Sequence, residues 1–115
     1  MIRYRNTALS NSDVQAVVCG TGGLNIRGFN IINPNSTDVY VKFYDGLAAN
    51  VTVGTTTPIL TLLVPANGSV FEPFESQKVV AFFNTAITLA CVTGLADSST
   101  TAPSTAIHVS IQYSS

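Results

Sequence analysis

A single histidine and two closely spaced glutamates are the residues with the clearest potential for acid–base chemistry. His108 lies between Ile107 and Val109 in an alternating segment, which places its imidazole on the outer side of a predicted strand, far in sequence from any patterned carboxylate. Glu72 and Glu75 could form the carboxylate pair of a glycoside hydrolase, but an odd spacing along a strand points them to opposite faces. We therefore predict that the chain is not an enzyme.

The segments that could hold a cofactor or a metal ion lack the rest of their motifs. Residues 20–23 (GTGG) resemble the start of a dinucleotide fingerprint, but the sixth position is Asn25 and a strand pattern follows where a helix is needed. Cys19 and Cys91 are far apart in sequence, which excludes a C-x-x-C redox pair and a zinc knuckle. We expect two reduced thiols in the core, with a disulfide as the alternative. No cofactor and no metal site is predicted.

Two groups of aromatic and basic residues are candidates for contacts with a partner. Tyr40 and Tyr44 share one strand face with Lys42, a pattern that suits stacking on a sugar or packing against a protein. The alternative is that this face is the other side of a sandwich or an interface between copies of the chain. At the N-terminus, arginines flank an aromatic residue, and both residue types are enriched in interfaces. The predicted interface residues are Ile2, Arg3, Tyr4, Arg5, Tyr40, Lys42 and Tyr44.

Period-two alternation of apolar residues recurs along the chain, and no segment shows the apolar spacing of a helix. Eight or nine short strands are predicted, separated by turns rich in Gly, Pro, Asn and Ser. Their ranges are 2–8, 14–19, 24–33, 39–44, 59–64, 69–74, 79–83, 87–93 and 107–113. Such spacing is typical of an all-β, single-domain antiparallel β-sandwich of jelly-roll type.

The N-terminal segment is predicted to be an arm that precedes the sandwich. In the first five residues apolar and basic side chains alternate, and a polar stretch from Asn6 to Asp13 follows. This composition favours an arm over residues 1–13 and a β-sandwich domain over residues 14–115. The alternative is that the segment pairs within its own sandwich.

The chain of 115 residues is poor in charge, with 5 basic and 6 acidic residues and a net charge of −1. Its charged fraction of 10% compares with about 25% in average proteins. There is no basic patch for nucleic acid or for an anionic membrane. Neutral hydroxyls and amides are cheaper to desolvate than charges, so we expect a homo-oligomer, with a Thr-rich monomer as the alternative.

Several strand and turn segments resemble small virion structural proteins of tailed bacteriophages. They are 38–45 (DVYVKFYD), 53–58 (VGTTTP), 60–69 (LTLLVPANGS), 92–94 (VTG), 97–101 (DSSTT) and 107–113 (IHVSIQY). The resemblance covers about the last three-quarters of the chain and leaves residues 1–23 uncovered. It implies a β-sandwich that decorates or cements a capsid, often as a homotrimer, with an arm or loop that grips capsid protein.

The expected function is therefore that of a capsid decoration (cement) protein of a tailed phage. The expected partners are the major capsid protein and further copies of the chain, in a trimer; nucleic acid and membranes are not expected partners. The expected location is the capsid surface of the virion, after synthesis in the host cytoplasm. Two alternatives stay open: a neck, tail or fibre component of the virion, and a carbohydrate-binding module that uses Tyr40 and Tyr44.

Overall fold

The computed structural model describes residues 2–9 and 16–115, and this part of the chain forms nine strands and one short 3₁₀ turn. Each of the nine predicted ranges overlaps one of these strands, with ends that differ from the prediction by a few residues. The strands are β1 (Ile2–Leu9), β2 (Val17–Thr21), β3 (Leu24–Asn33), β4 (Val39–Asp45), β5 (Leu60–Val64), β6 (Gly68–Glu72), β7 (Ala81–Phe83), β8 (Ala86–Val92) and β9 (Ile107–Ser114); the 3₁₀ turn is η1 (Ala48–Asn50).

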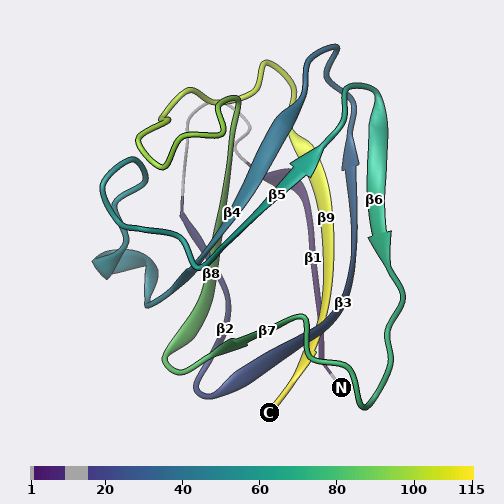
Figure 1. Ribbon diagram of the computed structural model, residues 1–115, viewed down its shortest axis with the longest axis vertical. Helices are drawn as coiled ribbons and strands as arrows, with labels where there is room; N and C mark the ends of the chain where they lie inside the picture. Colours follow the sequence, from purple (N-terminus) through teal and green to yellow (C-terminus); the bar gives the residue numbers. More distant parts are fainter. Residues whose placement is uncertain (1, 10–15) are drawn as a thin grey trace.

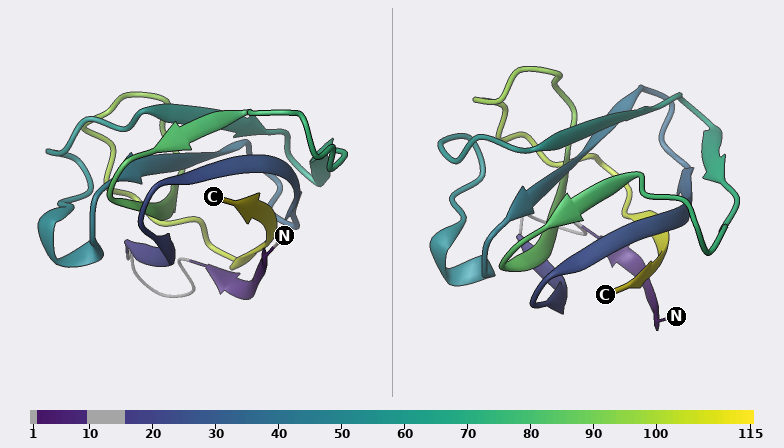
Figure 2. Two further views of the ribbon diagram at one scale, coloured as in Figure 1. Left: turned by 90° about the horizontal axis from the view of Figure 1, so that it is seen from below. Right: turned by 60° about the horizontal axis from the view of Figure 1, so that its bottom comes forward.

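The strands form two antiparallel sheets packed face to face (Figure 1; Figure 2). Sheet A has the order β1-β9-β3-β6, with β7 paired to the start of β3 on the same edge that pairs with β6 further along, and sheet B has the order β2-β8-β4-β5. Four antiparallel pairs are nested in sequence, namely β4 with β5, β3 with β6, β2 with β8 and β1 with β9. The chain is therefore one long hairpin folded over onto itself, which is the jelly-roll arrangement. The predicted antiparallel sandwich is confirmed.

The core lies between the two sheets and is built by the alternating inward side chains of both. On β9, Ile107, Val109 and Ile111 are buried, while the residues between them are exposed or half-buried. Cys19 on β2 and Cys91 on β8 also belong to the core, and neither forms a disulfide, as predicted. Burial raises the pKa of each thiol to about 12, so both remain protonated and unreactive at neutral pH.

The two sheets differ in what covers their outer faces. Every residue of β8 is buried, although β8 lies inside sheet B and has side chains on both faces of it. The β4–β5 loop (46–59) and the β8–β9 loop (93–106) cover the outer face of sheet B and lie on the same side of the molecule in Figure 1. Contacts with the strands below hold them there: Thr88 Oγ1 donates to Gly46 O at 2.5 Å, and Lys42 Nζ donates to Ala96 O.

A network of two buried asparagines joins the loops at one end of the sandwich. Asn33 Nδ2 donates to the carbonyls of Thr37 (3.0 Å) and Val64 (3.1 Å), and Asn33 Oδ1 accepts from Asn35 N at 2.9 Å. Asn35 Oδ1 accepts in turn from Thr105 N at 2.7 Å. The β3–β4, β5–β6 and β8–β9 connections are thus tied together by side-chain amides that satisfy buried backbone groups.

At the opposite end of β4, the carboxylate of Asp45 holds the turn between β7 and β8. It accepts hydrogen bonds from the backbone N–H groups of Asn84 (2.9 Å), Thr85 (2.8 Å) and Ala86 (3.3 Å). Desolvation raises the pKa of Asp45, but the three N–H donors outweigh it, and the pKa lies below its usual value. The charged carboxylate is therefore the form that stabilises this turn.

The predicted N-terminal arm is wrong over residues 2–9, because these residues form β1. In the β1–β9 register Tyr4 lies opposite Ile111 and Leu9 lies opposite Ile107, and Leu9 is fully buried. The alternation of the first residues is thus that of an edge strand, and the sandwich begins before residue 14. The remaining residues of the predicted arm that follow β1, 10–13, lie outside the described residues.

We expect a chain that lacks residues 1–9 to lose about 3 kcal/mol or more of unfolding free energy, because Leu9 and the β1–β9 ladder leave the fold. Thermal unfolding followed by circular dichroism measures the change in Tm. Leu9→Ala should show most of the effect, while Arg5→Gln on the same strand should stay within about 0.5 kcal/mol of the wild type. An unchanged Tm for the truncated chain would restore the arm hypothesis.

Replacing Asp45 with Ala is expected to destabilise the protein by about 1–3 kcal/mol at pH 7, because three N–H donors lose a charged acceptor. Asp45→Asn keeps one acceptor oxygen without the charge and should lose less. Since the folded-state pKa is lowered, the advantage of wild type over Asp45→Asn should be complete above about pH 3.9 and vanish as the pH falls through the lower folded-state value. Denaturant unfolding at a series of pH values checks this; a difference that does not change with pH contradicts it.

Candidate functional site

The outer face of sheet A, called here the open face, is the sheet surface that the loops leave uncovered. Residues opposite each other in neighbouring strands share a face, so the register gives its rows of side chains. One row runs from Arg5 on β1 through Ser110 on β9 and Asn30 on β3 to Phe71 on β6. The open face therefore joins four strands that are far apart in sequence.

The next row of the open face carries the histidine. His108 on β9 lies opposite Ile32 on β3, which in turn lies opposite Ser69 on β6. The side chains of His108, Ile32 and Ser69 are exposed. The imidazole thus stands near Arg5 across the β1–β9 pair, although more than 100 residues separate the two in sequence.

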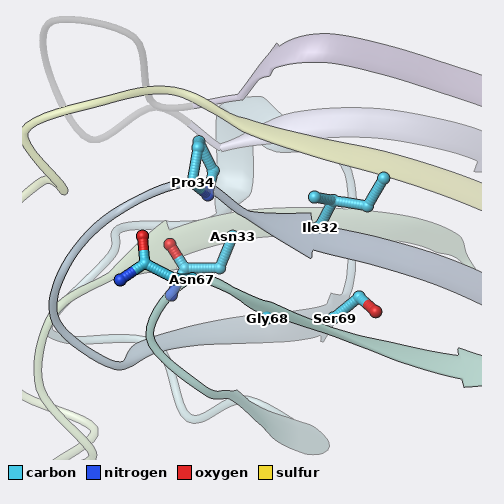
Figure 3. A pocket seen from close by; sticks show the side chains of 6 residues that line it. All are labelled: Ile32, Asn33, Pro34, Asn67, Gly68 and Ser69. Atoms are coloured by element: carbon cyan, nitrogen blue, oxygen red, sulfur yellow. The ribbon is translucent and has the colours of Figure 1, made fainter.

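These rows enclose a pocket of about 240 Å³. Its lining residues come from β1, β3 and β9 and are Arg5, Thr7, Asn30, Ile32, His108, Val109 and Ser110. A second, more open hollow of about 450 Å³ adjoins it, and Ile32 borders both. The second hollow lies between the β3–β4 and β5–β6 connections, and Figure 3 shows Ile32, Pro34 and Ser69 around it.

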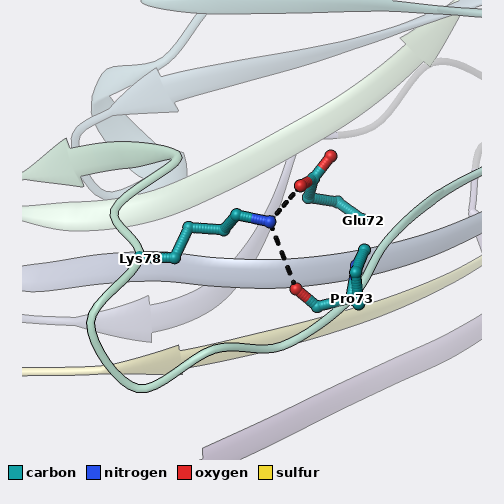
Figure 4. Close-up of polar contacts among 3 residues, drawn as sticks. All are labelled: Glu72, Pro73 and Lys78. Atoms are coloured by element: carbon teal, nitrogen blue, oxygen red, sulfur yellow. Dashed lines mark hydrogen bonds and ion pairs between the residues drawn. The ribbon is translucent and has the colours of Figure 1, made fainter.

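The charge on the open face is positive, because strands β1, β3 and β9 contain no acidic residue. Glu72 at the end of β6 forms an ion pair with Lys78, and Lys78 Nζ also lies 3.4 Å from Pro73 O (Figure 4). Arg27 is held by Ser114 Oγ (2.5 Å) and Lys78 O (2.8 Å). Arg5 forms no hydrogen bond or ion pair within residues 2–9 and 16–115, so its guanidinium has donors to offer to a ligand.

Apolar side chains border the open face along β6 and β7. Phe71 on β6 is 68% exposed, and Phe82 on β7 is 52% exposed. Phe82 lies opposite Asn25 and so shares the outer side of sheet A. Phe74 and Val79, in the link between the two strands, are exposed as well. An aromatic border next to a polar pocket is typical of surfaces that bind a partner.

The structure divides the predicted N-terminal contact residues between the two sides of sheet A. Arg3 and Arg5 lie on the open face, opposite Gln112 and Ser110. Tyr4 points inward, packs against the core and accepts a hydrogen bond from Asn6 Nδ2 at 3.0 Å; burial raises its pKa, the Asn6 bond lowers it, and the net shift is upward. Ile2 belongs to the same inward row and is half-exposed at the sheet edge.

The prediction that Lys42 and Tyr44 form a contact surface is wrong, because loops of the same chain bury both side chains completely. Burial lowers the pKa of Lys42, and the charge of Asp97 partly opposes this. Burial also raises the pKa of Tyr44, with a further contribution from Asp97. Tyr44 cannot stack on a sugar in this fold, so the alternative of a carbohydrate site that uses Tyr40 and Tyr44 fails on this strand. Tyr40 is half-buried opposite Leu63.

Sequence reasoning missed the residues that complete the pocket and its border. Asn30, Ile32 and Ser110 are ordinary members of alternating strands, and nothing in their types marks a site. A signal was present in the apolar pairs Ile31-Ile32 and Phe82-Phe83, in which one member must leave the core in a strand. Those outward members, Ile32 and Phe82, lie on the open face.

No group of three or more His, Cys, Asp or Glu residues within the described chain is placed to hold a metal ion. None of the helical turns in residues 2–9 and 16–115 has the length and apolar character needed to cross a membrane. Comparison with protein-family models, with curated proteins and with solved structures found no significant match.

Two buried tyrosines give opposite predictions for removal of a hydroxyl. Tyr44 Oη has no hydrogen-bond partner within the described residues, so Tyr44→Phe is expected to stabilise the protein by about 1 kcal/mol. Tyr113 Oη donates to Cys19 O at 3.0 Å, so Tyr113→Phe is expected to destabilise it by about 1 kcal/mol. Denaturant unfolding measures both, and a loss of stability in Tyr44→Phe would show that its hydroxyl is satisfied in solution.

Proposed function

We propose that this protein is a structural component of a tailed-phage virion that binds the assembled capsid and stabilises it without catalysing a reaction. The observation that carries the proposal is the open face with its apolar border. The chain's own loops cover most of the outer face of one sheet, where Leu63 stays half exposed, and the other sheet presents exposed aromatic side chains on a chain with few charges. The segments that resemble virion structural proteins support the location.

The physical basis is the low cost of burying this surface. Phe71 and Phe82 supply apolar area, and the polar groups between them are mostly neutral hydroxyls and amides. Aromatic residues in contact surfaces contribute strongly when they are desolvated, and neutral groups cost less to desolvate than charges. Arg3 adds a forked donor for carboxylates or carbonyls of the capsid protein.

Stabilisation follows from mass action. A protein that binds only assembled capsomers stabilises the assembled shell by RT ln(1 + [L]/Kd) for each site, summed over many sites. A homotrimer would place several open faces on neighbouring capsomers and raise the effective concentration of each. The major capsid protein and further copies of this chain are the proposed partners, on the outer surface of the virion.

Binding of the purified protein to capsids of the phage that encodes it tests the proposal. Phe71→Ser and Phe82→Ser are expected to weaken cosedimentation with capsids by about tenfold or more. Leu95→Ser is the matched control, because Leu95 is 65% exposed but lies in the loop over sheet B; it should change binding by less than about twofold. Equal effects of all three substitutions, or no binding by the wild type, would contradict the proposal.

A neck, tail or fibre component remains the second candidate, because the same exposed aromatic border would serve a ring of copies. Quantitative mass spectrometry of purified virions separates the two. Decoration requires on the order of hundreds of copies per particle, whereas a neck ring with closed symmetry requires about a dozen.

A further inference from the structure

We propose that the pocket between Arg5 and His108 binds a sugar acid, a pyranose ring that carries a carboxylate. This binding activity goes beyond the structural role above and does not depend on it. The pocket is the place where a cation that has no partner among residues 2–9 and 16–115, several neutral donors and acceptors and an apolar wall converge.

The size of the pocket suits one sugar ring. Its volume of about 240 Å³ lies just below the range of about 300–1,000 Å³ that is usual for pockets that bind drug-sized ligands. It equals the volume that about eight water molecules occupy in liquid water. The carboxylate side chain of a protein partner would leave much of this space unfilled.

Arg5 supplies the recognition of the carboxylate. Its planar guanidinium forms paired hydrogen bonds to the two oxygens of a carboxylate. Within the described chain nothing competes for it, since β1, β3 and β9 carry no acidic residue and Glu72 is paired with Lys78. Arg27 on β3 is already held by hydrogen bonds to Ser114 Oγ and Lys78 O.

The remaining lining residues match hydroxyl groups rather than a second charge. The hydroxyls of Thr7 and Ser110 and the amide of Asn30 each offer both a donor and an acceptor. Sugar hydroxyls need both functions, whereas a phosphate group needs donors alone. Ile32 gives the pocket an apolar wall for the C–H groups of a ring, and the imidazole of His108 stands beside it as a further hydrogen-bonding group.

Titration of the ¹⁵N-labelled full chain with sodium glucuronate tests the proposal, with glucose, sodium acetate and inorganic phosphate as comparison ligands. We expect glucuronate to shift the amide signals of Asn30, His108 and Ser110, and to bind about tenfold more tightly than glucose or acetate. Each comparison ligand lacks one part of the proposed recognition: glucose lacks the carboxylate, and acetate lacks the ring.

Arg5→Gln should weaken glucuronate binding by about tenfold or more. Arg3→Gln is the matched control, because Arg3 lies on the same strand and the same face but outside the pocket lining; it should change binding by less than about twofold. Both substituted side chains are exposed at the sheet edge, and an unchanged Tm confirms that each variant is folded.

Four results would overturn the proposal. Equal losses in Arg3→Gln and Arg5→Gln would show general charge attraction. Phosphate that binds as tightly as glucuronate would show a simple anion site, and acetate that does so would point to an acidic side chain of a protein partner. Absence of any shift at about 50 mM glucuronate would show that the pocket does not bind a sugar acid. None of these results alters the capsid-binding test, which uses substitutions on β6 and β7.

Discussion

Strand β8 is buried along its whole length, and most other features of the molecule depend on this burial. A strand inside a two-layer sandwich has one face in the core, and its other face needs a cover if it is apolar. Here β8 carries apolar side chains on both faces, including Ala90 and Val92 on the outer one opposite Lys42 and Tyr40. The loops 46–59 and 93–106 provide the cover and add a third layer to the two-sheet sandwich on the side of sheet B.

Ordering these two loops costs conformational entropy, so well-formed polar contacts are needed to offset that cost. The β8–β9 loop is fixed at one point by Lys42, whose ammonium donates to Ala96 O, and at another by the side-chain amide of Asn35, which contacts Thr105. The two loops also touch each other: a Cβ on Gly54, which has a φ of 92°, would overlap the side chain of Thr100. Glycine is the residue that tolerates both that φ and that close approach.

Alternation was sufficient to predict the strands, but it could not predict which sheet face would be covered. The bounds of β3, Leu24–Asn33, follow directly from its pattern and its flanking turns. On β4, by contrast, Tyr40, Lys42 and Tyr44 have the composition of a half-solvated face, and only a contact with a loop 54 residues later buries Lys42. The arm prediction for the N-terminal strand fails for a related reason: its arginines suggest an arm, whereas its pairing partner β9 lies at the far end of the chain.

Arg3 and Arg5 are predicted contact residues and lie on the open face, but the rest of the candidate site could not be predicted, because neighbouring side chains on this face come from β1, β3, β6 and β9. With a net charge of −1 the molecule has no strong long-range field, and salt screens exposed charges beyond about 8 Å at physiological ionic strength. The arginines on β1 therefore act at contact distance rather than by steering a partner from afar. Selectivity on such a surface depends on shape and on hydrogen bonds that a wrong ligand leaves unmade, and Arg5 together with Asn30 and Ser110 provides those bonds at one place.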